Sequence, residues 1–365
     1  MTYLFAALIL LTGILIYNNK VLSTLFIIIL IVWGGTVCYN ADYFLYEFDY
    51  NNYNILKISE PFFRLILKTF NDLGFSYSQF RFIIIMLMIL SYFFVVKKLT
   101  PNTTNVIMLY TIFPFCINIT QLRFAMALPF LYVGIYLLLK NKERNLKNII
   151  GYVLCIILGG LIHTSIFLFI LFLIPIIFKK NWKKILIVLL VISILFVFTS
   201  SVLSIVGNNL ITKKINFVLK RSTEGTNGVI RTHLGTFVKC SIWLAIYFVI
   251  HEYMKRKIYK YMNERDKFID DSIFKFNICS IVFLPWIFYV TDLCRLYEAT
   301  LLINYVSLSF FYSYYKIAKI PNSTRLLYTL STTILPLTVL VTIVLTGNIG
   351  MNYVFLKLFN SSTLF

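Results

Sequence analysis

Two long uncharged stretches restrict this chain to a membrane-spanning fold. Residues 185–206 and 326–346 contain no charged side chain and are mainly apolar. A helix needs about 20 such residues to cross the roughly 30 Å hydrocarbon core of a bilayer, where backbone N–H and C=O groups must be paired within the protein. Segments of about ten residues with alternating polarity, which are typical of a membrane β-barrel, do not recur along the chain.

Hydrophobic residues occupy 59% of the 365 positions and charged residues only 13%. This apolar content exceeds what one globular core can bury, so lipid must be the solvent. The sequence predicts an all-α fold, a polytopic bundle that forms one transmembrane domain over residues 1–365. About twelve helices are expected, at residues 2–17, 21–37, 79–96, 103–119, 124–139, 148–163, 165–178, 185–206, 235–251, 273–290, 296–315 and 326–346.

The first expected helix, at residues 2–17, is interpreted as a retained membrane helix. No positive residue precedes it, and no small-residue cleavage site leads into a soluble domain, as a secretory signal peptide would require. We therefore expect this segment to belong to the membrane bundle.

Lysine and arginine are concentrated in alternate connections, which predicts the orientation of the helices. These connections hold 21 of the 34 cations, at Lys20, Lys97 and Lys98, and within 140–147, 179–184, 255–275 and 316–325. They are expected on the cytoplasmic side, with both termini outside. Two longer segments, 38–78 and 207–234, then also lie outside. The net charge of +20 is thus an orientation signal and does not indicate nucleic-acid binding.

The first outer segment contains a predicted amphipathic helix at residues 60–73. Its start is signalled by Ser59 as N-cap, followed by Glu60 and Pro61. One face carries the apolar side chains Phe62, Phe63, Ile66, Leu67 and Phe70. Such a helix either lies on the membrane surface or packs on the bundle as a lid.

Motifs that bind nucleotides or metals are missing from the sequence. It has no P-loop of the form GxxxxGK[ST], and its six cysteines show neither CxxC nor His-paired spacing. We expect the cysteines to pack as small residues, and no cofactor or bound metal is predicted.

Polar and ionisable side chains follow four helices at ends that the charge pattern places outside. Such groups cost free energy near hydrocarbon unless they are paired or face water. They are Asp42, Tyr43, Tyr46, Glu47 and Asp49; Gln121 and Arg123; His163 and Thr164; and Asp292, Arg295, Tyr297 and Glu298. Because all these ends face one side, they are the predicted location of a site.

Two of these residues, Arg123 and Arg295, can each bind a phosphate with two parallel N–H donors, a geometry that lysine cannot provide. A lipid-linked pyrophosphate is the obvious anion for such a pair. The alternative is that each arginine anchors its helix at the interface or forms an ion pair. For Arg295 the nearby Asp292 is the most serious competitor.

Two residues are candidates for a general base. His163 ends an apolar helix next to Gly159 and Gly160, and a neutral imidazole there can accept a proton. A histidine in such a turn is more often a structural hydrogen-bonding residue. Asp42 is the competing base, although with Glu47 and Asp49 it could instead bind a divalent cation.

The second outer segment, 207–234, departs from the alternation of charge because it is cationic. Its arginines, Arg221 and Arg231, flank a flexible STEGTNG sequence together with several lysines. Such a loop either recruits an anionic lipid-linked substrate or acidic glycan, or it is a solvated loop whose charge has no binding role.

Three stretches of the sequence resemble the EpsG branch of the Wzy-type polysaccharide polymerases. They are NADYFLYEFDY leading to SEPFFRLILKTFNDLGFSYSQF, then NITQLRFAMALPFLYVGIYLLLKNK, then the helix that ends in GGLIHTSIF. The resemblance covers about residues 30–180, with a weaker similarity at DLCRLYE. One position departs from the family pattern: Arg123 is followed by Phe124, where members often have glutamine.

The resemblance implies a GT-C-like membrane glycosyltransferase that uses undecaprenyl-pyrophosphate-linked oligosaccharides outside the bacterial cytoplasmic membrane. On this basis Arg123 and Arg295 are expected to bind the pyrophosphate, and His163 or Asp42 to activate the acceptor hydroxyl. Supporting substrate contacts are expected from Gln121, Tyr43, Tyr46, Glu60, Tyr297, Arg221 and Arg231.

Three alternative functions are a flippase for lipid-linked oligosaccharide, a related glycan ligase and an acyltransferase. A flippase should place charges near the bilayer midplane, along a central cavity. The expected partners of a polymerase are the lipid-linked substrate, membrane lipid and a chain-length regulator of the same pathway, but no nucleic acid.

Overall fold

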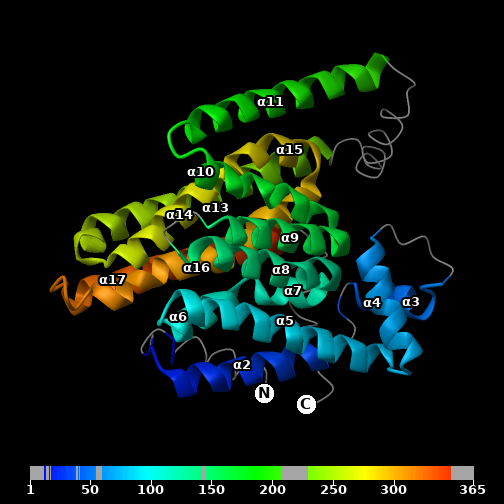
Figure 1. The fold of residues 1–365 in the computed structure, drawn as a ribbon, viewed down its shortest axis with the longest axis horizontal. Coiled ribbons are helices and arrows are strands. Elements are labelled where there is room, and N and C mark those ends of the chain that lie inside the picture. Colours follow the sequence, from blue (N-terminus) through cyan, green and yellow to red (C-terminus); the bar gives the residue numbers. More distant parts are fainter. Residues whose placement is uncertain are drawn as a thin grey trace. The chain divides into compact units, whose positions relative to one another are not determined.

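The computed structural model describes residues 12–13, 16, 18–37, 40, 42–54, 60–141, 145–206 and 229–346 of the chain. Side chains are described at these positions except 198–206, 229–233, 289 and 343–346. The regular secondary structure of these residues is helical (Figure 1). The predicted all-α class is therefore confirmed. The expected helix at residues 2–17 falls largely outside the described residues.

The helices of the first half of the chain are joined by short connections. They are α2 (Lys20–Thr36), α3 (Tyr43–Asn51), α4 (Pro61–Asp72), α5 (Tyr77–Leu99), α6 (Thr103–Ile112), α7 (Phe115–Thr120), α8 (Leu122–Leu139), α9 (Leu146–Ile162), the 3-10 helix η1 (Thr164–Phe172) and α10 (Leu173–Ile177).

Longer helices dominate the second half of the chain. They are α11 (Trp182–Val206), α13 (Val229–Ile258), η2 (Tyr259–Tyr261), α14 (Glu264–Ser280), η3 (Ile281–Phe283), α15 (Leu284–Tyr289), η4 (Thr291–Cys294), α16 (Arg295–Tyr314) and α17 (Asn322–Thr346).

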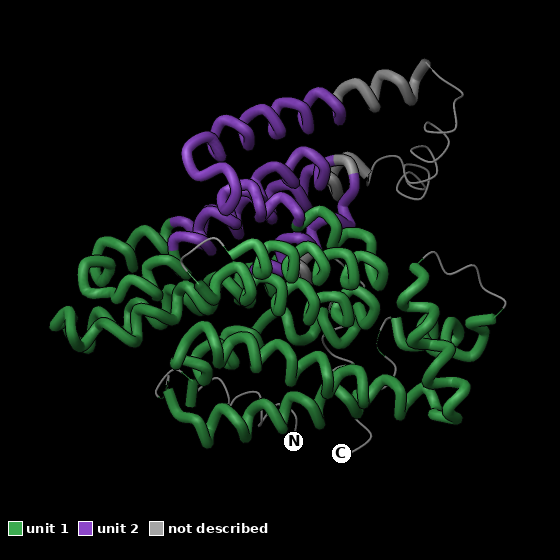
Figure 2. The backbone as a smooth tube through the Cα atoms, in the orientation of Figure 1, with its two compact units in different colours: residues 1–169, 249–270, 301–365 green, residues 170–248, 271–300 purple. Residues whose placement is uncertain are grey.

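The chain divides into two compact units (Figure 2). Unit 1 comprises Met1–Phe169, Val249–Asp270 and Leu301–Phe365, and unit 2 comprises Ile170–Phe248 and Asp271–Thr300. The 3-10 helix η1 and the helices α13, α14 and α16 each contribute residues to both units. The two units are therefore interleaved along the sequence.

In unit 1, α5 packs against α2 and α8, and α8 packs along α9. A glycine permits the close approach of α8 and α9, because a Cβ added at Gly159 would lie 3.2 Å from the backbone oxygen of Ala127. Tyr92, which is fully buried, donates its hydroxyl to the backbone oxygen of Ala125 at 2.7 Å. Small residues at helix contacts and bonded hydroxyl groups are the usual means of holding membrane helices together.

In unit 2, aromatic stacking contributes to the packing of the helices. Phe196 of α11 stacks on Trp286 of α15 with ring centroids 4.9 Å apart. Phe172, the last residue of η1, stacks on Phe276 of α14 at 4.6 Å. Aromatic pairs at such distances add stability beyond the area that they bury.

Five helical stretches among the described residues are long and apolar enough to cross a membrane. They are Tyr77–Leu99, Leu122–Leu139, Leu234–Tyr261, Glu264–Phe288 and Asn322–Thr342. Shorter apolar helices lie at Lys20–Thr36, Thr103–Ile112, Leu146–Ile162 and Thr164–Ile177. A multi-pass helical membrane protein is thus confirmed, while the number of twelve spans and the GT-C-like fold stay predictions.

Several predicted elements differ from the observed ones in extent. The expected helix 103–119 is two helices, α6 and α7, which are separated at the cis peptide bond between Phe113 and Pro114. The expected helix 165–178 is mainly the 3-10 helix η1. Helix α3 was not predicted at all, because its mixed polar and aromatic sequence, YFLYEFDYN, lacks a long apolar run.

The amphipathic stretch forms α4, but its first turn differs from the expected one. Glu60 is the N-cap residue and Pro61 begins the helix, where a missing N–H is harmless. Ser59, the predicted N-cap, lies outside the described residues. The helix buries Phe63 and Leu67, while Leu65 and Lys68 are exposed. The apolar face of α4 therefore packs on the protein, as a lid on the bundle would, and contact of this helix with the membrane surface stays a prediction.

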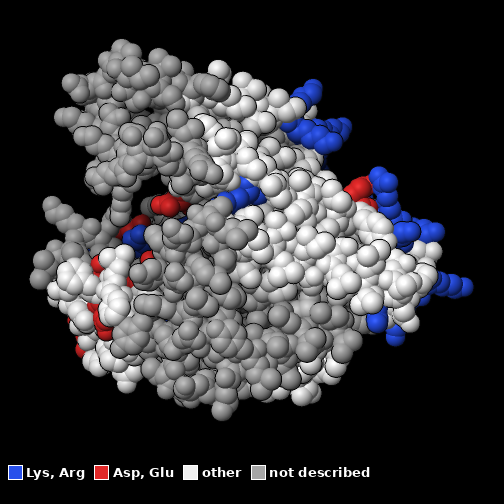
Figure 3. All heavy atoms as spheres, turned by 180° about the vertical axis from the view of Figure 1, so that it is seen from behind, with Lys and Arg blue, Asp and Glu red and all other residues white. Residues whose placement is uncertain are grey.

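Charged side chains are distributed unevenly over the surface. Figure 3 shows groups of Lys and Arg side chains that project from the surface of the described residues. In unit 1, contacts join several ends that the sequence predicts to be cytoplasmic. Arg265 donates to the backbone oxygen of Lys98 at 2.6 Å, and the N–H of Asn19, next to Lys20, donates to Thr104 at 3.2 Å.

Candidate functional site

The best-defined group of predicted site residues lies in unit 1, where α3, α4, α8 and α9 meet. Helix α4 packs against α3 and α9, and α9 packs against α8. The residues concerned sit at the start of α8, at the end of α9 and at the start of α4. In each case the helix end is the one that the charge pattern predicts to lie outside.

Arg123, in the first turn of α8, forms an ion pair with Glu60. Its Nη1 lies 3.3 Å from Glu60 Oε2; the Glu60 side chain is 7% exposed and the Arg123 side chain 33% exposed. Both residues are among the predicted site residues, but their pairing is not, since 63 positions separate them. Sequence spacing gives no signal for a contact of this kind.

The Arg123 guanidinium retains donor capacity beyond this ion pair. Its Nε is buried and makes no hydrogen bond to any described residue. A buried N–H without an acceptor is costly, so it favours a partner that is supplied from elsewhere. The Arg123 side chain as a whole is one third exposed, whereas Nε itself is buried.

A second carboxyl group, that of Asp49 in α3, lies within electrostatic range of Arg123. Burial raises the pKa of Asp49 above its ordinary value, and the Arg123 charge partly opposes that rise. Because burial and the Arg123 charge act in opposite directions on the same carboxyl group, its ionisation depends on whether Arg123 is present.

Aromatic contacts join α4 to this ion pair, to α3 and to α8. The Arg123 guanidinium carbon lies 5.8 Å from the centre of the Phe63 ring, a cation–π distance. Tyr46 of α3 contacts the same ring at 6.4 Å, and Phe62 contacts Phe130 of α8 at 6.3 Å. The buried face of α4 therefore holds the arginine from one side.

His163 is the C-cap residue of α9, in extended conformation. Its Nδ1 lies 2.7 Å from Ser165 Oγ, within hydrogen-bond distance. Its ring meets that of Phe124, the residue after Arg123, edge to face at 5.1 Å. The structure thus places His163 close to the helix end that carries Arg123, and its half-buried side chain is fixed on two sides.

The remaining predicted residues of the first outer segment have defined positions. Tyr43 is buried, with its hydroxyl 3.2 Å from Ser78 Oγ, and Tyr46 is half-buried. Asp42 precedes α3 as its N-cap residue and makes no capping hydrogen bond. Gln121 lies between α7 and α8, where its backbone links the two helices.

Arg81 lies in this region but is not among the residues that the sequence predicts for the site. It lies in α5, is 2% exposed, and donates to the backbone oxygens of Gly34, Gly35 and Ile119 at 3.0, 3.3 and 3.1 Å. The available signal was an isolated arginine within an apolar helix, which is costly unless it is bonded.

Arg295 lies in unit 2, at the first position of α16. Among the described residues no ion pair joins Arg295 to Asp292, the predicted competitor. Arg295 and Asp292 each lie within electrostatic range of the buried Glu298. Tyr297 is 2% exposed and donates its hydroxyl to the backbone oxygen of Ser280, which favours a structural role. Convergence of Arg295 with Arg123 stays a prediction.

Two predicted substrate-binding residues fall in the cationic segment. Arg221 lies outside the described residues. Arg231 belongs to α13, but its side chain is not described. Over the described part of the chain, no three His, Cys, Asp or Glu side chains form a group that could hold a metal ion.

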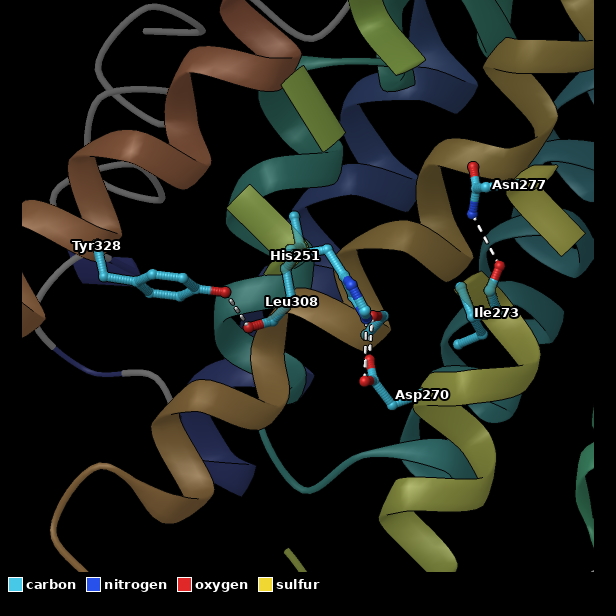
Figure 4. A network of polar contacts seen from close by, with 7 residues as sticks. His251, Asp270, Ile273, Asn277, Leu308 and Tyr328 are labelled. Atoms are coloured by element: carbon cyan, nitrogen blue, oxygen red, sulfur yellow. Dashed lines mark hydrogen bonds and ion pairs between the residues drawn. The ribbon is translucent and has the colours of Figure 1, made fainter. Parts of the chain in front are cut away.

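A separate polar network lies inside unit 1, away from these helix ends (Figure 4). His251 Nε2 of α13 is 3.0 Å from Asp270 Oδ2 of α14, and Ser307 of α16 donates its hydroxyl to Asp270 Oδ1. All three side chains are completely buried. Nearby, Tyr328 of α17 donates to the backbone oxygen of Leu308 at 2.9 Å. The network thus connects α13, α14 and α16 through buried side chains.

Comparison with protein-family models gives a match to the model described as the EpsG family, over residues 19–357. This range extends well beyond the three stretches that carry the resemblance in the sequence. No curated protein and no solved structure matches the chain.

Proposed function

Because the chain belongs to the EpsG family, we propose that it polymerises a surface polysaccharide, by transferring a growing glycan from undecaprenyl pyrophosphate onto a lipid-linked repeat unit. Family membership suggests a polymerase-type role on a lipid-linked oligosaccharide. The donor lipid, the capsular or extracellular nature of the product and the side of the membrane are parts of the proposal. The bacterial cytoplasmic membrane is its expected location, with the site facing outside.

The observation that supports this proposal most directly is the state of Arg123. Glu60 holds one edge of the guanidinium, while the buried Nε has no acceptor among the described residues. A pyrophosphate oxygen would supply that acceptor. In the proposed reaction Arg123 binds the leaving pyrophosphate and stabilises the negative charge that grows on it as the glycosidic bond breaks. Arg295 would supply the second cation.

The reaction needs a base for the acceptor sugar. The acceptor hydroxyl oxygen forms a bond to the anomeric carbon of the donor as the bond from that carbon to the pyrophosphate oxygen breaks. The hydroxyl proton passes to His163 or, in the alternative, to Asp42. His163 is the preferred base because Ser165 and Phe124 fix its ring beside the helix that carries Arg123.

Deletion of the gene, followed by analysis of the surface glycan, tests the function. We expect single repeat units to replace the polymer, and the wild-type gene to restore long chains. His163→Ala and Arg123→Lys should each insert at wild-type abundance but leave single repeat units, since lysine keeps the charge and loses the forked donor geometry. Polymer of normal length in the deletion strain would overturn the proposal.

A flippase is the second candidate, because His251 and Asp270 are ionisable groups buried within helices long enough to span the membrane. Intramembrane ionisable residues often mark transport pathways. The two side chains are bonded to each other, which favours a structural role instead. Absence of any exported glycan after deletion, in place of single repeat units, would support the flippase.

A further inference from the structure

Arg81 is the largest side chain that is fully buried among the described residues, and it is positively charged. It lies in the second turn of α5, near the helix end that the charge pattern predicts to be outside. A buried charge is tolerated only where other groups compensate it. The role of Arg81 therefore follows from what compensates it.

Backbone oxygens at the ends of two helices supply this compensation. Nη1 of Arg81 donates to Gly34 and Gly35 in the last turn of α2, and Nη2 donates to Ile119 in the last turn of α7. The last carbonyl groups of a helix have no partner within the helix and carry a partial negative charge. One guanidinium thus satisfies three carbonyl groups and joins two helix ends.

The same guanidinium is in contact with the segment that leads into α3. Its carbon lies 5.9 Å from the centre of the Tyr43 ring, in the first turn of α3. The side chain of Asn40 also donates to Ile119 O, at 3.2 Å. Arg81 therefore lies where the end of α7, the end of α2 and the start of α3 come together.

These three segments lead directly to the candidate site. Ile119 is four residues before Arg123, and only Gln121 separates α7 from α8. Helix α3 carries Tyr46, which contacts the Phe63 ring, and Asp49, which is within electrostatic range of Arg123. Any displacement of the Ile119 carbonyl or of the Tyr43 ring would change the distance between Arg123 and α3.

We propose that Arg81 is a positioning residue for the transfer reaction, which sets the start of α8, and hence Arg123, relative to α3. This proposal rests on the proposed function. Arg81 would touch no substrate, because its bonded nitrogens point to the protein backbone and its side chain is buried. Lysine in its place keeps the charge but cannot bridge three acceptors in a fixed plane.

Steady-state kinetics of the purified full-length protein test this role. The substrate is the lipid-linked repeat unit extracted from a strain that lacks the gene. For Arg81→Lys we expect kcat to fall by about tenfold to a hundredfold, with KM changed less than about twofold, because a small misplacement of catalytic groups costs rate more than binding. Wild-type kcat and KM in this variant would overturn the proposal.

Arg265→Lys is the matched control. Arg265 also donates to a backbone oxygen at the end of a helix, that of Lys98, but at the opposite end of α5 and on an exposed side chain. We expect wild-type kinetics from this variant. An equal loss of kcat in both variants would mean that any arginine bonded to a helix-end carbonyl group affects the rate. Arg81 would then have no special role in the site.

A distance measurement keeps the test independent of the activity. Spin labels at Asn51 on α3 and Leu87 on α5, both exposed, report the distance of α3 from the helix that carries Arg81. Arg81→Lys should shift or broaden this distance distribution, and Arg265→Lys should not. An unchanged distribution would overturn the proposal even if the wild-type protein proves not to polymerise. If Arg81→Lys fails to accumulate, Tyr43→Leu removes the ring contact with Arg81, together with the contact of the Tyr43 hydroxyl with Ser78, and should give a smaller effect of the same kind.

Discussion

At the scale of single residues, Arg123 is held by three groups from two other helices, α4 with its N-cap residue and α3. Glu60 pairs with it at 3.3 Å, Phe63 lies under its guanidinium, and Asp49 is within electrostatic range. A charge at the edge of an apolar bundle is stable only with such support. The same support restricts the direction in which Arg123 can bind an anion.

Exchange of the two paired residues separates the structural role of the pair from a catalytic one. Glu60→Ala should lower stability by about 1–3 kcal/mol, because it leaves a partly buried cation without its partner. The double variant Glu60→Arg with Arg123→Glu restores opposite charges and should recover part of that stability, yet form no polymer.

Thermal unfolding in detergent and glycan length in cells are the two measurements for this exchange. Arg64→Gln, on the exposed side of α4, is the control and should leave both unchanged. Polymer formation by the exchanged double variant would show that the site needs only an ion pair there.

Asp49 gives a pH-dependent prediction. Folding raises the pKa of Asp49, so ionisation of its carboxyl group opposes the folded state. The loss of stability begins as the pH rises above the ordinary pKa of aspartate and is complete above the raised pKa. Asp49→Asn cannot ionise and should therefore raise the melting temperature at pH 7. The gain should shrink as the pH falls towards the ordinary pKa of aspartate, about 4. A gain that grows on acidification would mean that the pKa is lowered instead.

At the scale of helices, the sequence predicted the long apolar elements well and the irregular ones poorly. Apolar length decides whether a segment can lie in lipid, so α2, α5, α8 and α9 appear close to their expected positions. The break at Phe113–Pro114 and the 3-10 helix η1 depend on local backbone geometry, which hydropathy does not report. Helix α3 depends on packing against α4 and α5.

The polar network of α13, α14 and α16 provides a test at this scale. Asp270→Asn or His251→Gln should each destabilise the protein by about 3–5 kcal/mol, because each leaves a completely buried polar partner unsatisfied. The double variant should cost less than the sum of the two, since the interaction is lost only once.

Unfolding in mixed detergent, followed by the fluorescence of the four tryptophans, measures these differences. Asp271→Asn changes the neighbouring carboxyl group, which is half-buried, and is the matched control. Additive losses in the double variant would show that His251 and Asp270 are not energetically coupled.

At the scale of the whole molecule, the distribution of cations predicts which helix ends face the cytoplasm. A cysteine introduced at Asn51 should react with an impermeant reagent added to intact cells, and one at Lys316 should react only after the cells are opened. Both positions are exposed. If the cysteine at position 316 reacts from outside, the orientation is opposite to the predicted one, and the proposed site does not face the outer surface.

The candidate site was partly predictable from the sequence. Arg123, Glu60 and His163 were found because polar groups at apolar helix ends are rare and need a reason. The contact partners of these residues could not be predicted. Contacts such as that between Glu60 and Arg123 join positions that only tertiary packing brings together. Arg81 was missed because its partners are backbone oxygens, which leave no pattern in the side chains.

The order of the buried network along the chain has a consequence for membrane insertion. An isolated aspartate at the centre of a membrane helix costs about 2.5–3.5 kcal/mol on the insertion scale. Asp270 follows His251 by 19 positions, whereas Ser307 is synthesised 37 positions later. The nascent hairpin of α13 and α14 therefore carries its own partner for the carboxyl group when it leaves the translocon. We expect the pair to form during synthesis, before α16 exists, so that the aspartate enters the lipid already bonded.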